Sequence, residues 1–178
     1  MAAAWGGVGA RLPGGGLGSA LRSAVAGAPV PDVRAGRAGL LLLGGGRGAS
    51  DDDVAPDLPA VRTMLRTAVS DEVPTLAVCL GAQLLAVANG GRVERNPGGP
   101  EFGAQLIAKR GNAANDPLFG PMPITPDVIQ WHFDAITALP PGALQLASSP
   151  GCEQPAFRLG RLAWALQFPI DTPPALVR

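Results

Sequence analysis

Short apolar runs and amphipathic stretches alternate along the middle of the chain. The first run, Gly39–Leu43, has the length of a strand buried on both faces of a parallel sheet. Residues 58–69 repeat apolar residues at helical spacing, with one stripe formed by Leu58, Val61, Leu65 and Ala68. A second strand over 74–78 leads into a second apolar helix over 80–88. This order predicts an α/β fold with a doubly wound, mostly parallel sheet and flanking helices.

The parts of the chain on either side carry weaker patterns. Downstream, we expect a loop over the Gly- and Pro-rich segment 96–103, then strands over 104–109, 128–134 and 144–148 and a hairpin over 156–168.

The first 36 residues are rich in Gly, Ala and Pro, and they encode no clear element beyond one short helix over 17–26. N-terminal strands are therefore weak or missing. We divide the chain into a poorly defined segment over 1–36 and one folded domain over 37–178.

Cys79 stands between the second strand and the second helix. Small residues flank it at Ala77 and Gly81, as a sharp strand-to-helix elbow requires. A thiol at a helix N-terminus is favoured as thiolate, which is the better nucleophile. The alternative for the same residue is a small buried cysteine in a Val- and Leu-rich core.

A glycine-rich turn, Gly44–Gly48, follows the first strand, where open α/β sheets place their binding sites. No GK[ST] sequence follows it, so a phosphate loop is excluded. Asp51, Asp52 and Asp53 come next, and we interpret them as a solvated loop rather than a metal site. The two cysteines lack the spacing of a disulfide framework or a metal site, and we expect no metal and no cofactor.

Composition and charge narrow the class of partner. Lys109 is the one lysine among 14 basic residues, a bias that indicates GC-rich coding rather than a functional patch. The formal net charge is zero, which does not favour nucleic acid. No run approaches the ~20 apolar residues of a membrane span, and the N-terminus lacks the pattern of a signal peptide. We expect a cytoplasmic protein.

Five blocks of the chain resemble motifs of one known family. The cysteine block resembles the nucleophile motif G-x-C-x-G-x-Q of class I glutamine amidotransferases, and the glycine-rich turn resembles their GG-x-x-G loop. Residues 131–134 are similar to the W-H-x-D block of the branch related to the amidotransferase domain of GMP synthase. Segments 96–103 and 156–168 match further blocks, so the resemblance covers roughly residues 38–168. It implies a flavodoxin-like sheet.

The resemblance also implies a thiol mechanism. Cys79 would attack the side-chain amide of glutamine, while backbone N–H groups of Gly45 and Leu80 hold the oxyanion. A histidine, oriented by a glutamate two residues on, would shuttle the proton that releases ammonia. The residues that would contact the backbone groups of the glutamine are Gln83, His132, Phe133 and Asp134.

The chain departs from the family at the histidine. The family's last block reads Q-F-H-x-E, and here Pro169 stands at the position of the histidine and Asp171 at that of the orienting acid. Proline has neither a titratable group nor an N–H, so it cannot serve as acid or base. Ala77 also replaces the usual glycine before the elbow.

Three functions remain open at this point. The first is a glutaminase or amidotransferase in which His132, the chain's one imidazole, replaces the missing base. The second is a pseudo-amidotransferase that binds a γ-glutamyl ligand or a partner protein without turnover. The third is a thiol hydrolase acting on another substrate, against which the match at Gln83 favours glutamine. No ATP-binding motif is present, so a synthetase would be a separate partner.

Overall fold

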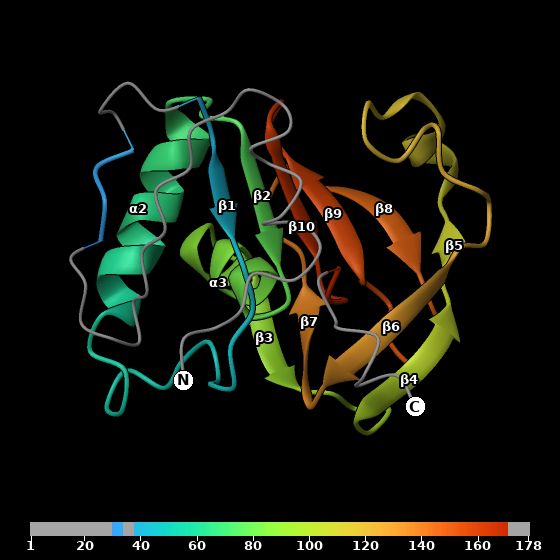
Figure 1. The fold of residues 1–178 in the computed structure, drawn as a ribbon, viewed down its shortest axis with the longest axis horizontal. Helices are drawn as coiled ribbons and strands as arrows, with labels where there is room; N and C mark the ends of the chain where they lie inside the picture. The colour runs from blue at the N-terminus through green and yellow to red at the C-terminus, as the bar shows by residue number, and fades with distance from the viewer. Residues whose placement is uncertain (1–29, 34–37, 171–178) are drawn as a thin grey trace.

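A central six-stranded sheet organises the computed structural model, which describes residues 30–33 and 38–170 (Figure 1). The strands lie in the order β1-β2-β10-β9-β8-β5. Their bounds are β1 Leu40–Leu42, β2 Thr75–Val78, β10 Ala163–Leu166, β9 Ala156–Leu159, β8 Leu144–Ser148 and β5 Ala108–Lys109. The predicted helix over 17–26, the boundary at residue 36 and Asp171 lie outside the described residues.

The α/β class with a central sheet is confirmed, but the sheet is mixed where a mostly parallel sheet was predicted. β2 pairs in parallel with β1 and with β10. The pairings of β10 with β9, β9 with β8 and β8 with β5 are antiparallel. The physical reason is connection length, since the short links of 148–156 and 159–163 can join only antiparallel neighbours.

Two strand pairs stand beside the main sheet. β3 (Arg92–Arg95) pairs antiparallel with β7 (Asp134–Ala138), and β4 (Glu101–Leu106) pairs antiparallel with β6 (Asp127–His132). The predicted loop over 96–103 is therefore wrong in its last residues, because pairing with β6 outweighs the Gly and Pro content. The predicted strand over 128–134 is broken at Phe133, and β3 and β7 were not predicted.

The two predicted helices that fall within the described residues are confirmed. α2 spans Leu58–Ser70 and α3 spans Leu80–Ala88, and a 3₁₀ turn, η3, covers Gly111–Asn115. The whole predicted stripe of α2 is buried. α2 packs against α3, and α3 in turn packs against β2 and β10, so the helices cover one end of the sheet (Figure 1). Among the described helices, none is long and apolar enough to cross a membrane.

The sheet separates two hydrophobic clusters. Along β10 the side chains alternate, with Ala163 and Ala165 in the cluster under α2 and α3. Trp164 and Leu166 point into the other cluster, whose centre includes Phe119 and Leu146. β1 is half-buried rather than buried on both faces as predicted, because in the described residues β2 is its one hydrogen-bonded neighbour.

One buried carboxylate ties the segment after η3 to the sheet. Asp116 accepts hydrogen bonds from the N–H groups of Leu118 and Phe119 and from the indole N–H of Trp164, at 2.9, 3.0 and 3.1 Å. The Arg158 guanidinium lies 3.3 Å from the same carboxylate, whose side chain is 0% exposed. This network fixes the covering segment against β9 and β10.

Candidate functional site

Cys79 forms the elbow between β2 and α3 in a conformation that L-residues rarely adopt. Its backbone φ is 55° and ψ is −115°, which costs about 1–3 kcal/mol at a residue other than glycine. The backbone holds it there, because the Cys79 N–H donates to the carbonyl of Leu166 at 2.7 Å and the Cys79 carbonyl accepts from the N–H of Gln83 at 3.2 Å. Cys79 as a whole is half-buried.

Glycines make room for this elbow. A Cβ on Gly81 would lie 2.5 Å from the carbonyl oxygen of Leu42, so only glycine lets α3 start so close to β1. A Cβ on Gly44 would lie 2.9 Å from Cys79 Cβ and 3.4 Å from its Sγ. A Cβ on the next residue, Gly45, would lie 3.3 Å from a methyl group of Leu80. The glycine-rich turn therefore lies directly against the thiol, with the two expected oxyanion residues close together.

Gln83, one turn into α3, connects three parts of the site. Its buried side-chain amide donates to the carbonyl of Asp134 at 3.0 Å and to Gln167 Oε1 at 3.4 Å. These contacts bind the start of β7 and the end of β10 to the helix that carries Cys79. The structure thus brings the 132–134 segment to the helix that carries Cys79, and the Gln83 amide nitrogen donates to protein acceptors.

His132, the first residue of the 132–134 segment, is buried, with 5% of its surface exposed. Its Nε2 atom lies 3.1 Å from Gln130 Oε1 and 3.1 Å from Glu101 Oε2. Burial lowers the pKa of His132, and burial also raises the pKa of Glu101. Sequence reasoning did not find Glu101, because strand pairing rather than any motif places it opposite His132.

The other two expected substrate residues face outward. The ring of Phe133 is 48% exposed, lies edge-on to Phe102 at 5.2 Å between centroids and has the guanidinium of Arg95 4.7 Å from its centroid. Asp134 is half-buried, and its carboxylate lies 3.6 Å from Arg95.

Pro169 follows the end of β10 in the chain. It stands three residues after Leu166, whose carbonyl accepts from Cys79, and it is half-buried after the buried Phe168.

The aspartates after the glycine-rich turn form hydrogen bonds with the turn and with α2. Asp51 accepts a hydrogen bond from the N–H of Gly48 at 2.7 Å. Asp52 receives two hydrogen bonds from the Arg62 guanidinium, at 2.8 and 2.6 Å, and these lower the pKa of the Asp52 carboxyl. In the part of the chain that the structure describes, these carboxylates belong to no group of three residues placed to hold a metal ion.

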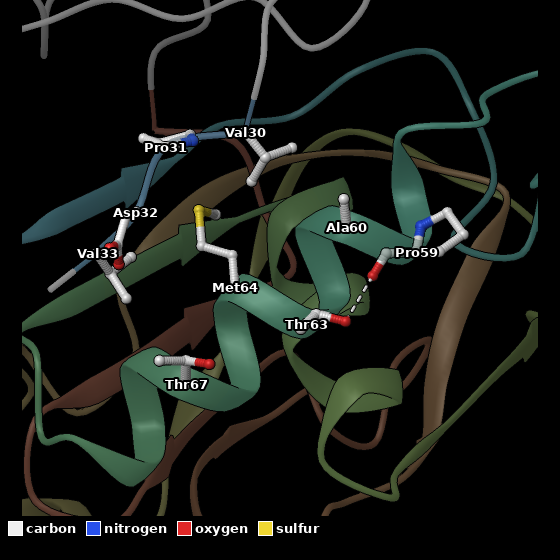
Figure 2. A pocket seen from close by; sticks show the side chains of 9 residues that line it. All are labelled: Val30, Pro31, Asp32, Val33, Pro59, Ala60, Thr63, Met64 and Thr67. Atoms are coloured by element: carbon white, nitrogen blue, oxygen red, sulfur yellow. Dashed lines mark hydrogen bonds between the residues drawn. The ribbon is translucent and has the colours of Figure 1, made fainter.

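A hollow of about 480 Å³ opens elsewhere, between residues 30–33 and the outer face of α2 (Figure 2). Its wall includes Val33, Met64 and Thr63, whose hydroxyl is turned back to the carbonyl of Pro59 at 3.0 Å. None of the residues that line this hollow belongs to the elbow, so we do not include the hollow in the candidate site.

Comparisons with known proteins identify the family of the chain. Residues 28–168 match the family model of the class I glutamine amidotransferases, and the chain belongs to this family. The chain is 35% identical over 131 residues to a GMP synthase [glutamine-hydrolyzing] of Parafrankia sp. (strain EAN1pec), covering 72% of this chain and 22% of that protein. It is 38% identical over 115 residues to a GMP synthase [glutamine-hydrolyzing] of Thermus thermophilus, covering 65% of this chain and 21% of that protein. It therefore spans about a fifth of these relatives.

Solved structures give the same family. A glutamine amidotransferase from Methylobacillus flagellatus superposes with a TM-score of 0.87 at 29% identity, covering 98% of this chain and 68% of that one. A glutamine amidotransferase from Thermotoga maritima superposes with a TM-score of 0.84 at 25% identity, covering 94% and 71% of the two chains.

Proposed function

We propose that this domain binds glutamine, or a γ-glutamyl compound, at the elbow, and that Cys79 is its nucleophile. The observation that carries the proposal is the strained, half-buried Cys79 with Gly44 and Gly45 packed against it. Glutamine is supported by family membership and by the words "glutamine-hydrolyzing" in the names of the relatives. Any contact of His132 to the ligand would come from its backbone, because its ring is buried.

In the proposed reaction the thiolate sulfur of Cys79 bonds to the amide carbon, and the carbonyl electrons move to the oxygen. The N–H groups of Gly45 and Leu80 would receive this oxyanion. Collapse of the adduct expels ammonia once its nitrogen gains a proton, and water then hydrolyses the thioester to glutamate. Both the protonation and the activation of water call for an acid–base group at the elbow.

We propose that Pro169 removes that group and leaves only slow turnover. By motif, Pro169 occupies the position of the family's histidine, and His132 is not a substitute because its Nε2 faces Gln130 and Glu101. The lack of an acid–base side chain at Pro169 also favours a second candidate, a pseudo-amidotransferase that holds the ligand or a partner without turnover. We propose that any ammonia released serves a synthetase on a separate polypeptide or domain, in line with the similarity to GMP synthases.

Ammonia release from glutamine separates these functions when it is measured for the native chain, Cys79→Ser and Pro169→His. We expect slow release that requires Cys79, and an increase of about 10²–10⁴-fold in Pro169→His, the usual contribution of general acid–base catalysis. A glutamine-analogue electrophile should label Cys79 in both the native chain and Pro169→His.

Labelling without any Cys79-dependent ammonia in the native chain would establish the pseudo-amidotransferase. A folded chain that neither releases ammonia nor labels at Cys79, before and after Pro169→His, overturns the proposal.

A further inference from the structure

A second cluster of reactive side chains lies where the end of β6 and the start of β4 meet the turn before β9. Glu101 and His132 stand directly opposite each other in the β4–β6 ladder, and Cys152 comes from the turn. One donor atom from each residue lies within 4.8 Å of the other two. The three residues are 4%, 5% and 2% exposed.

Glu101 and His132 both carry buried atoms without a hydrogen-bond partner among the described residues, and the Nδ1 atom of His132 is one of them. Neither carboxylate oxygen of Glu101 accepts a hydrogen bond from any residue that the structure describes. His132 Nε2 lies 3.1 Å from Oε2, but its hydrogen-bond partner is Gln130 Oε1 at the same distance. A carboxylate buried without donors is costly, so the position is better explained if a cation completes it.

The turn that carries Cys152 is built against Glu101. Three hydrogen bonds join Ser149 and Cys152. The Cys152 carbonyl accepts from the Ser149 N–H at 2.8 Å and from the Ser149 hydroxyl at 3.0 Å, and the Cys152 N–H donates to Ser149 Oγ at 3.0 Å. The buried Asn96 side chain donates to the carbonyl of Gly151 at 2.9 Å and holds the turn from outside. A Cβ on Gly151 would lie 2.3 Å from Glu101 Oε1, so the glycine is what admits the carboxylate.

We propose that Glu101, His132 and Cys152 bind one Zn²⁺ ion. One carboxylate oxygen, one imidazole nitrogen and one thiolate form a donor set that zinc commonly takes, with one position left open. Zinc bond lengths imply donor separations of about 3.3–3.8 Å, and the Glu101–His132 pair at 3.1 Å is already that close. The third donor must move inward from a separation of up to 4.8 Å, which side-chain rotation can supply.

Binding replaces the thiol proton of Cys152, which leaves to solvent, by the metal ion. The ion would then fix the His132 ring and, through the backbone, the segment that leads to Asp134 and the Gln83 amide. This site is independent of the proposed glutamine reaction, and it can exist whether or not Cys79 turns over substrate.

Co²⁺ is the probe, because its tetrahedral thiolate complexes absorb light where Zn²⁺ complexes do not. The full chain, stripped with a chelator, is titrated with Co²⁺, which Zn²⁺ then displaces. The chain has two cysteines, so Cys152→Ser and Cys79→Ser form a matched pair. We expect one Co²⁺ per chain with a sulfur-to-cobalt charge-transfer band in the native chain and in Cys79→Ser.

In Cys152→Ser the band should vanish, and Zn²⁺ affinity should fall by about 100-fold or more, since even outer-shell partners typically contribute 10- to 100-fold. Zn²⁺ should also raise the melting temperature of the native chain and not that of Cys152→Ser. Glu101→Gln, checked for its fold by circular dichroism, supplies the same test through a second ligand.

The proposal is overturned if the folded native chain binds neither ion. It is equally overturned if the band persists in Cys152→Ser or is lost in Cys79→Ser, which would place the metal at the elbow instead.

Discussion

At the scale of single residues, the strain at Cys79 is imposed by its surroundings and not by its thiol. The hydrogen bond from its N–H to Leu166 and the start of α3 set the positive φ. Any side chain at this position would share that strain, and glycine alone would escape it.

Replacing Cys79 by glycine should therefore stabilise the fold relative to replacing it by alanine. The penalty of about 1–3 kcal/mol for positive φ exceeds the backbone-entropy cost of about 0.5–1 kcal/mol that glycine brings. Urea unfolding of Cys79→Gly and Cys79→Ala should differ by about 1 kcal/mol in favour of glycine. An alanine variant as stable as the glycine variant would show that the elbow is relaxed.

Gly81 gives a second prediction at this scale. In an open helix, alanine would improve on glycine by about 1 kcal/mol, but here the added Cβ would lie 2.5 Å from the Leu42 carbonyl. We expect Gly81→Ala to lower the free energy of unfolding by about 1–3 kcal/mol. Gly46→Ala is the control, because a Cβ there meets nothing within 4 Å, and it should change stability by less than about 0.5 kcal/mol. A neutral Gly81→Ala would contradict the close approach of α3 to β1.

At the scale of elements, α2 is attached to the loop that follows the glycine-rich turn. Arg62 of α2 donates to both carboxylate oxygens of Asp52 and to the carbonyl of Ala49 at 3.0 Å. α2 thereby holds the loop that follows the glycine-rich turn, and that turn packs against the thiol.

This attachment predicts a pH dependence. Arg62 lowers the folded-state pKa of Asp52 below its usual value of 3.8, so the stability that it contributes is fully present above that value. It is lost as the pH falls through the folded-state pKa. Native chain and Asp52→Asn should therefore differ in unfolding midpoint at neutral pH and converge in acid, and Asp53→Asn controls for the loss of one charge. Curves that stay parallel down to acid pH would rule the contribution out.

At the scale of the whole molecule, Asp116 connects the segment after η3 to β9 and β10, whose side chains include Arg158 and Trp164. Asp116→Ala would leave Arg158 and two backbone N–H groups without their buried acceptor. We expect a loss of about 3–5 kcal/mol in urea unfolding. Arg161→Ala, which removes an ion pair 77% exposed on the arginine side, should cost no more than about 1 kcal/mol. Equal effects of the two changes would show that Asp116 does not carry the network.

The same scale separates what the sequence could predict from what it could not. α2, α3, β2 and the elbow follow from local periodicity and small-residue spacing, and the structure contains each of them. The strand β8 and the hairpin of β9 and β10 were also predicted. The pairing of β5 with β8 and the pairs β3–β7 and β4–β6 depend on partners distant in the chain, which no local pattern encodes. For the same reason motif spacing drew attention to Cys79 as a candidate but did not bring Glu101, His132 and Cys152 together.

The place of β10 in the sheet has a consequence for how the chain is made. β10 inserts between β2 and β9, and the carbonyl that holds the Cys79 N–H belongs to its last residue, Leu166. A ribosome delivers β1, β2 and α3 well before β10, so a nascent chain carries the elbow sequence with an unfilled gap beside β2. The strained backbone conformation of Cys79 can form only after β10 emerges and pairs with β2. Until then the exposed edge of β2 is open to pairing with other chains.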